Sequence, residues 1–444
     1  MKNIELKKSV QVESLSPKKD YPTIILFFLL LTSSFLYMWI PRIYAFGNIK
    51  YYLYKNLSTG SSEMSDLLTE FPMYLKFLNP FIYLVLILTI IYVIAKYKII
   101  KNNYLIIYLW IIFYMCFLLA FKSTDPLIYL TSLSKASSIL APGTILMIFL
   151  FFLSYNPAVW NQIIVSLKLF VYIVLLCCLI GFFGIYYEYS SNGLIHRLVS
   201  LRWVWTPSLI LELICIILLA TNIKNKKNIF LFVPIIFLYL GGLLTQTRLT
   251  IIIGTINIFI FLYLTKKLRF SLSLFKRITL VIVVFCTCLF LYAVFAKTEF
   301  LDLYLEQFIS RVFEDTRSEQ ASNFFFIFSS NINDIFPFGS GYPAENEYRA
   351  IGETGIDSGY LNILFTTGIP MFLLVGLLLI IPVIKALRIN LSFSDAAIVA
   401  AAFTWILRLT SSSTMMFTTE FLLFVLFSGR CAWLVNNAKK GKSI

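Results

Sequence analysis

Four arginines are the residues of this sequence best suited to chemistry: two stand at the ends of apolar runs, and two lie six residues apart in a polar stretch. They are Arg248 in GGLLTQTRLTIIIG, Arg311 and Arg317 in ISRVFEDTRSEQ, and Arg408 in AAFTWILRLTSSS. Charged groups in or near a membrane are costly and tend to be functional. Arg248 is the most informative, because TQTR offers hydroxyls, an amide and a guanidinium whose planar fork matches phosphate oxygens. This segment predicts an anion site.

Each arginine also has a simpler interpretation. An arginine at the end of a membrane helix can extend along the apolar surface to water, which would account for Arg248 and Arg408. Arg311 and Arg317 would not share one face of a continuous helix. Glu314, three residues from each, could form weak surface ion pairs with them. The sequence leaves both interpretations open.

A second polar group stands at the start of the apolar run in GIDSGYLNILFTTGIP. There Asp357, Ser358 and Tyr360 precede the run directly. A short polar side chain could accept hydrogen bonds from the first free N–H groups of a helix, which would make Asp357 or Ser358 an N-cap. Tyr360 could be an aromatic of the membrane interface. Neither explanation accounts for the acid-rich, arginine-bearing loop that leads to the same place.

The sequence predicts neither a metal nor a cofactor. The glycines at 339–341 lack the lysine and the following helix of a phosphate-binding loop. The sole histidine, His196, belongs to no recognisable Ser–His–Asp arrangement. Glu345, Glu347 and Asp357 could in principle hold a metal ion. They lie on a long loop, however, where acids are usually just solvated.

The elements that must position these residues are predicted to be membrane-spanning helices. The 444 residues are 59% hydrophobic and 13% charged, whereas soluble domains carry about 25% charged residues. Apolar runs of about 20 residues recur along the chain. We therefore expect an all-α, polytopic integral membrane protein with about twelve spans, at 22–40, 77–95, 103–121, 136–153, 163–186, 208–223, 229–245, 249–265, 278–296, 359–383, 395–410 and 420–435.

The distribution of charge predicts the orientation. The net charge of +15 would suggest nucleic acid in a soluble protein, but here lysines and arginines gather in alternate connections, as in cytoplasmic loops. Most acids gather in the other connections. This pattern predicts a cytoplasmic tail at 1–21, one transmembrane domain at 22–435 and a second cytoplasmic tail at 436–444.

The largest outer (periplasmic) loop is expected at 297–358, between the ninth and tenth spans. Connections this long are usually functional or disordered. In its first part apolar residues recur every three or four positions and polar residues fall on the opposite side. This pattern predicts an amphipathic helix at the membrane surface. The later stretch FPFGSGYP, at 336–343, predicts a tight turn.

Together these segments resemble the O-antigen polymerase and ligase superfamily of bacterial membrane glycosyltransferases, especially the polymerases. The similar features are TQTRLTIIIG at a junction of spans, SRVFEDTR in the outer loop, FPFGSGYP, which resembles the family's phenylalanine-glycine-x-glycine turn, and DSGYLNILFTTGIP before the next span. The ligases generally carry a histidine and an asparagine where Asp357 and Ser358 stand, which favours a polymerase.

The resemblance implies transfer of a growing glycan from undecaprenyl pyrophosphate to another lipid-linked repeat unit, at the outer side of the inner membrane. The partners would be that lipid-linked glycan, membrane lipid and a chain-length-determinant membrane protein, and no nucleic acid. The catalytic candidates are Asp357, for activating or positioning the acceptor, and Arg311 and Arg317, for the pyrophosphate. The substrate-binding candidates are Arg248, Arg408, Ser358 and Tyr360, the last for stacking on a sugar.

Two alternatives remain open from the sequence. A ligase would join finished polymer to lipid A core. A flippase for lipid-linked sugars would share the twelve spans and inner termini, although carriers usually show internal repeats and polar residues near the middle of the bilayer. The polar groups of this chain gather at its predicted outer face instead.

Overall fold

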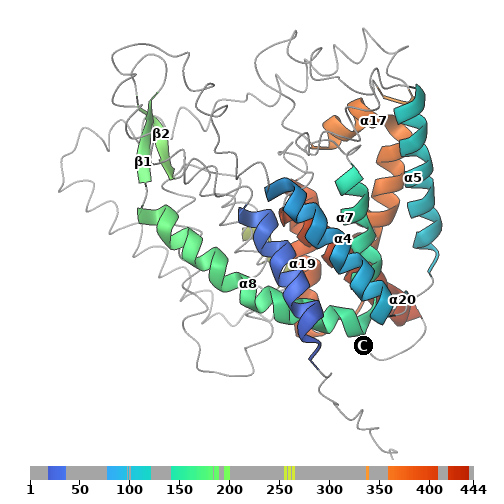
Figure 1. Cartoon of the computed structure of the whole chain (residues 1–444), viewed down its shortest axis with the longest axis horizontal. Helices are drawn as coiled ribbons and strands as arrows, with labels where there is room; N and C mark the ends of the chain where they lie inside the picture. The colour runs from blue at the N-terminus through green and yellow to red at the C-terminus, as the bar shows by residue number, and fades with distance from the viewer. Residues whose placement is uncertain are drawn as a thin grey trace, which may run out of the picture.

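The computed structural model describes residues 19–36, 78–97, 99, 102–121, 142–183, 185–189, 195–200, 255–257, 259–261, 263–265, 337–339, 359–408 and 419–439. This part of the chain is mostly helical (Figure 1). Its helices are the N-terminal helix Tyr21–Leu36, α4 Leu78–Lys96, α5 Tyr104–Phe121, α7 Pro142–Ser154, α8 Pro157–Phe183, α17 Gly359–Val375, the π-helix η2 Gly376–Ile380, α18 Ile381–Ala386, α19 Phe393–Arg408 and α20 Thr419–Lys439.

Three helical segments among the described residues are long and apolar enough to cross a membrane, namely Pro157–Val174, Thr367–Ala386 and Thr419–Lys439. The second of them runs through α17, η2 and α18. Shorter apolar helices are Tyr21–Leu36, Pro80–Lys96, Tyr104–Leu118 and Thr144–Ser154. These apolar helices confirm the coarse prediction of a helical membrane protein.

The described helices overlap the predicted spans at 22–40, 77–95, 103–121, 136–153, 163–186, 359–383, 395–410 and 420–435, in the parts of those ranges that the structure describes. The predicted spans at 208–223, 229–245 and 278–296 lie outside the described residues, and 249–265 is described only in short helical pieces. The outer loop at 297–358 is described only at 337–339.

A short β-hairpin follows α8, which the all-α prediction did not include. Strands β1 Ile185–Tyr189 and β2 Ile195–Ser200 pair antiparallel, from Ile185 opposite Ser200 to Tyr189 opposite Ile195. The strands are rich in β-branched and aromatic residues, which favour extended backbone. Asn192 and Gly193 lie between them and form a dipeptide typical of hairpin turns.

The core is apolar, and so is much of the outside. Phe151, Phe170 and Phe427 are fully buried, and the rings of Trp405 and Phe424 stack with centroids 4.0 Å apart. Large side chains on α4 and α5 are exposed all the same, among them Leu84, Ile91, Trp110 and Phe113. A helix that is hydrophobic on both its buried and its exposed faces suits a lipid environment.

Small residues allow the later helices to pack closely. The stretch Ala396–Ala402 of α19 is buried almost completely. At Gly429 of α20 a Cβ would overlap the carbonyl oxygen of Phe151 and the hydroxyl of Ser154 on α7. Close approach of backbones through small residues is the usual way in which membrane helices associate.

Candidate functional site

The helix α17 is broken inside the stretch TTGIP. Gly368 has φ 73° and ψ −177°, so the helix stops at Thr367 and starts again at Ile369 and Pro370. Only glycine adopts this backbone conformation at little cost. Proline suits the first turn of the second half, because it lacks the N–H that would have no helical partner there.

A turn from the predicted outer loop docks into this break. Residues Pro337 to Gly339 form the turn, with Gly339 at φ 83°; they are the described part of FPFGSGYP, for which a tight turn was predicted. The backbone N–H of Ile369 donates to the carbonyl oxygen of Pro337 at 3.0 Å. A Cβ at Gly368 would overlap that same carbonyl, so glycine is required for the approach as well as for the break.

Helix α5 completes this junction. The Tyr114 hydroxyl lies 2.9 Å from the carbonyl oxygen of Thr367 and 3.3 Å from that of Phe338, so its one proton can be donated to either. The ring of Phe117 lies against the ring of Phe338, with centroids 5.5 Å apart. In Figure 1, α5 and α17 run side by side at the end of the bundle where α17 begins.

The same end of the bundle holds two of the predicted site residues. The Tyr360 hydroxyl, in the first turn of α17, donates to the carbonyl oxygen of Ile406 in α19 at 2.8 Å. Ile406 lies two residues before Arg408, so the structure brings these two segments together. The ring of Tyr360 is partly exposed and meets Phe372 edge-on at 6.0 Å.

Arg408 lies at the end of α19 and is buried, with 4% of its surface exposed. Its Nη2 is 3.8 Å from Oε1 of Glu420, which opens the first turn of α20 and is equally buried. The charge of Arg408 is therefore balanced by a neighbouring helix. A phosphate at this place would meet a carboxylate beside the guanidinium.

The other predicted site residues lie outside the described residues: Arg248, Arg311, Arg317, Asp357 and Ser358. Their predicted roles stay predictions. Sequence reasoning missed Glu420, although an acid that opens an apolar run was a signal for it. It also missed Tyr114, for which nothing in the local sequence gives a signal.

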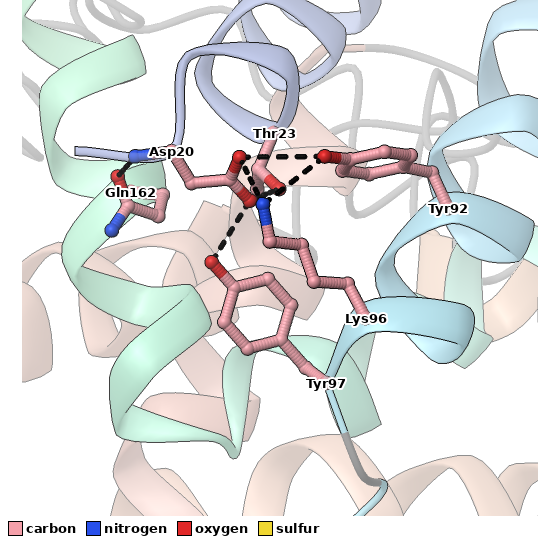
Figure 2. Close-up of polar contacts among 6 residues, drawn as sticks. All are labelled: Asp20, Thr23, Tyr92, Lys96, Tyr97 and Gln162. Carbon is pink, nitrogen blue, oxygen red and sulfur yellow. Dashed lines mark hydrogen bonds and ion pairs between the residues drawn. The ribbon is translucent and has the colours of Figure 1, made fainter. Parts of the chain in front are cut away.

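A second polar cluster lies at the opposite ends of the helices (Figure 2). Asp20, just before the N-terminal helix, is 6% exposed and forms an ion pair with Lys96 of α4, with Oδ1 and Nζ 2.7 Å apart. Tyr97 donates to Oδ2 of Asp20 at 2.9 Å, and the backbone N–H of Asp20 donates to Oε1 of Gln162 in α8 at 3.1 Å. The cluster joins the N-terminal helix to α4 and α8.

Hydrogen bonding determines the charge state of this cluster. Burial alone raises the pKa of Asp20, but hydrogen bonds from Lys96, Thr23 and Tyr97 outweigh it and hold the pKa below its ordinary 3.8. The hydrogen bond to Asp20 raises the pKa of Lys96. Because the pKa of Asp20 is lowered, its ionisation stabilises the fold fully at pH values above the ordinary pKa of 3.8. Because the pKa of Lys96 is raised, its protonation stabilises the fold fully at pH values below the ordinary pKa of 10.5. The pair is therefore fully charged and stabilising at neutral pH.

The cluster around Asp20 has a structural character, because its donors and acceptors bond to one another and connect the N-terminal helix with α4 and α8. The junction of α5, α17 and the Pro337–Gly339 turn, with Tyr360 and Arg408 nearby on α17 and α19, is the candidate functional site. Comparison with protein-family models, with curated proteins and with solved structures finds no match to this chain.

Proposed function

We propose that this protein polymerises undecaprenyl-pyrophosphate-linked oligosaccharide repeat units into O antigen or a related surface polysaccharide. It does so as a protein of about twelve spans in the bacterial inner membrane, with both termini in the cytoplasm. The reaction takes place at the periplasmic face, where α17 begins.

One observation carries this proposal. Two of the segments that resemble the polymerases, FPFGSGYP and DSGYLNILFTTGIP, are in direct contact through the Pro337 carbonyl and the Ile369 N–H. A turn and a broken helix that fit each other support a common role for the two segments. A chance resemblance of two short motifs gives no reason for such a contact.

The proposed reaction needs few groups from the protein. An acceptor hydroxyl attacks the anomeric carbon of the donor sugar, the bond from that carbon to the pyrophosphate oxygen breaks, and undecaprenyl pyrophosphate leaves as the anion. Guanidinium groups stabilise the negative charge that develops on the leaving group. Asp357 takes the proton of the hydroxyl, and such a base contributes about 100- to 10,000-fold in rate.

The geometry of the described residues fits substrates that stay anchored in lipid. Tyr360 and Arg408 lie at one end of the helix bundle, on α17 and α19, and Tyr360 is bonded to the last turn of α19. A sugar at this end can lie outside the bilayer while its undecaprenyl chain remains within it. A site near the middle of the helices would suit a carrier better.

The test is deletion of the gene followed by analysis of the glycan ladder on a gel. Loss of a polymerase leaves lipopolysaccharide that carries single repeat units. Accumulation of long polymer on the undecaprenyl carrier would identify a ligase instead and overturn the proposal. Purified protein that fails to lengthen lipid-linked repeats in the absence of an ion gradient would point to transport.

A further inference from the structure

We infer that Tyr114 is a positioning residue of the polymerase, which holds the Pro337–Gly339 turn in the break of α17. This inference rests on the proposed function for its effect on the reaction. The contact itself rests on the structure alone and is tested separately below. Tyr114 lies on α5, more than 200 residues from the turn in the sequence.

The hydrogen bonds at the break form a matched set. A broken helix leaves carbonyl groups without partners at the end of its first half and N–H groups without partners at the start of its second half. Here the Tyr114 hydroxyl reaches the Thr367 carbonyl at the end of the first half. The Pro337 carbonyl accepts from the Ile369 N–H at the start of the second half. Tyrosine and turn therefore serve the two sides of the same break.

The burial of the break makes these partners necessary. Thr367 and Gly368 begin the segment Thr367–Ala386, which is long and apolar enough to cross a membrane, so the break lies at the edge of that segment. Thr367 is fully buried, and buried backbone groups need partners from the protein. The turn is held at this edge because α5 and α17 supply hydrogen bonds to its carbonyl oxygens.

Aromatic packing fixes the turn from the side. Phe338 lies against Phe117, and Phe117 stacks on the Tyr114 ring with centroids 6.1 Å apart. Phe338 keeps 38% of its surface exposed. The ring is therefore held along one side by α5 and is open on another.

The consequence for the reaction follows from chain connectivity. The turn lies within the outer loop, between the segment that carries Arg311 and Arg317 and the segment that carries Asp357. Fixing the turn limits where the two flanking segments can reach. Tyr114 touches no substrate in this scheme and acts only by holding the turn.

The contact can be measured without any assay of function. In a chain whose native cysteines are replaced, Phe117→Cys and Phe338→Cys remove the ring contact but keep the hydrogen bonds to the carbonyl oxygens of residues 337 and 338. A short thiol cross-linker should therefore still join the two cysteines in membranes. Gly368→Ala should abolish the cross-link, because its Cβ would overlap the Pro337 carbonyl. Gly376→Ala is the matched control on the same helical segment, since a Cβ there meets no described atom within 4 Å. Equal cross-linking in both glycine variants, or in neither, overturns the docked turn.

The effect on the reaction is tested with Tyr114→Phe, which removes one hydroxyl and keeps the ring. With purified protein and lipid-linked repeats, kcat should fall about three- to ten-fold, the value of one hydrogen bond. KM should change little, because the groups that the turn helps to position act on charge that develops in the transition state. A merely structural role would lower the yield of folded protein and leave kcat per folded molecule unchanged.

The outcomes separate this inference from the proposed function. Wild-type protein that makes no polymer from lipid-linked repeats defeats the proposed function, and with it the positioning role, while the cross-link still decides whether the turn is docked. Active wild-type protein with an unchanged kcat in Tyr114→Phe defeats the positioning role alone.

Discussion

Removing either member of the Arg408–Glu420 pair should destabilise the protein, and removing both should not. The two side chains are each 5% exposed, and Nη2 and Oε1 lie 3.8 Å apart. Arg408→Met alone leaves a carboxylate buried between α19 and α20, and Glu420→Met alone leaves a guanidinium there. Because each remaining charge stays buried and loses the attraction of this ion pair, both single variants should unfold at lower temperature.

The size of the effect follows from the distance. Two unit charges about 4 Å apart attract by about 4 kcal/mol when the effective dielectric constant is about 20. Breaking buried ion pairs from one side typically costs about 3–5 kcal/mol, whereas replacing both partners by apolar side chains of similar volume is often neutral or stabilising. We expect each single variant to lose about 3–5 kcal/mol and the double variant to recover most of it.

The assay is thermal unfolding of purified protein in one detergent, with polymerising activity measured on the same four samples. The double variant also separates the two interpretations of Arg408. If Arg408 contacts the pyrophosphate, the double variant should be stable and inactive. If the arginine only balances Glu420, the double variant should be stable and active. Single variants within about 1 kcal/mol of the wild type would refute the reasoning, because exposed pairs have that value.

Other predictions follow from the remaining contacts. Asp20→Asn should lower the unfolding temperature at neutral pH. Because the pKa of Asp20 is lowered, thermal melts of wild type and variant should converge only below its ordinary pKa of 3.8. Gly429→Ala should cost about 1–3 kcal/mol in chemical denaturation through overlap with α7, whereas Gly376→Ala should be near neutral. Arg430→Lys should cost about 1–2 kcal/mol in thermal melts, because Nε and Nη2 of Arg430 both donate to Oδ1 of Asp395, at 3.1 and 3.0 Å.

The apolar runs predicted the positions of the described helices because length and hydropathy are local properties. The span expected at 77–95 is α4 Leu78–Lys96, and that at 103–121 is α5 Tyr104–Phe121. Of the span expected at 136–153, the structure describes α7 Pro142–Ser154, whose first residue is a proline, a residue that suits the start of a helix. The strands after α8 were not predicted, because five or six residues rich in β-branched and aromatic types, as in IYYEY, cannot be told from the end of an apolar run by hydropathy alone.

The contacts of the candidate site depend on packing and were less predictable. Arg408 was predicted to be near the outer end of its helix, but its pairing with Glu420 requires α19 and α20 to lie together. Tyr360 was predicted as an interfacial or sugar-stacking residue, and its bond to Ile406 depends on α17 meeting α19. The ion pair of Asp20 and Lys96 joins residues 76 positions apart, each of which alone is an ordinary charge beside an apolar run.

The break in α17 shows where local reasoning could have gone further. The prediction ran one span straight from 359 to 383, although TTGIP contains a glycine and a proline two residues apart, the pair that ends one helix and begins another. A break within an apolar helix leaves backbone groups that need partners, so a segment that docks at Gly368 could have been expected from the sequence alone. What it could not supply was the identity of that segment. The turn Pro337–Gly339 was predicted on its own evidence, and only the fold places its carbonyl opposite the Ile369 N–H. A helix broken for flexibility alone would need no such close fit, so the absence of room for a Cβ at Gly368 favours a fixed junction over a hinge.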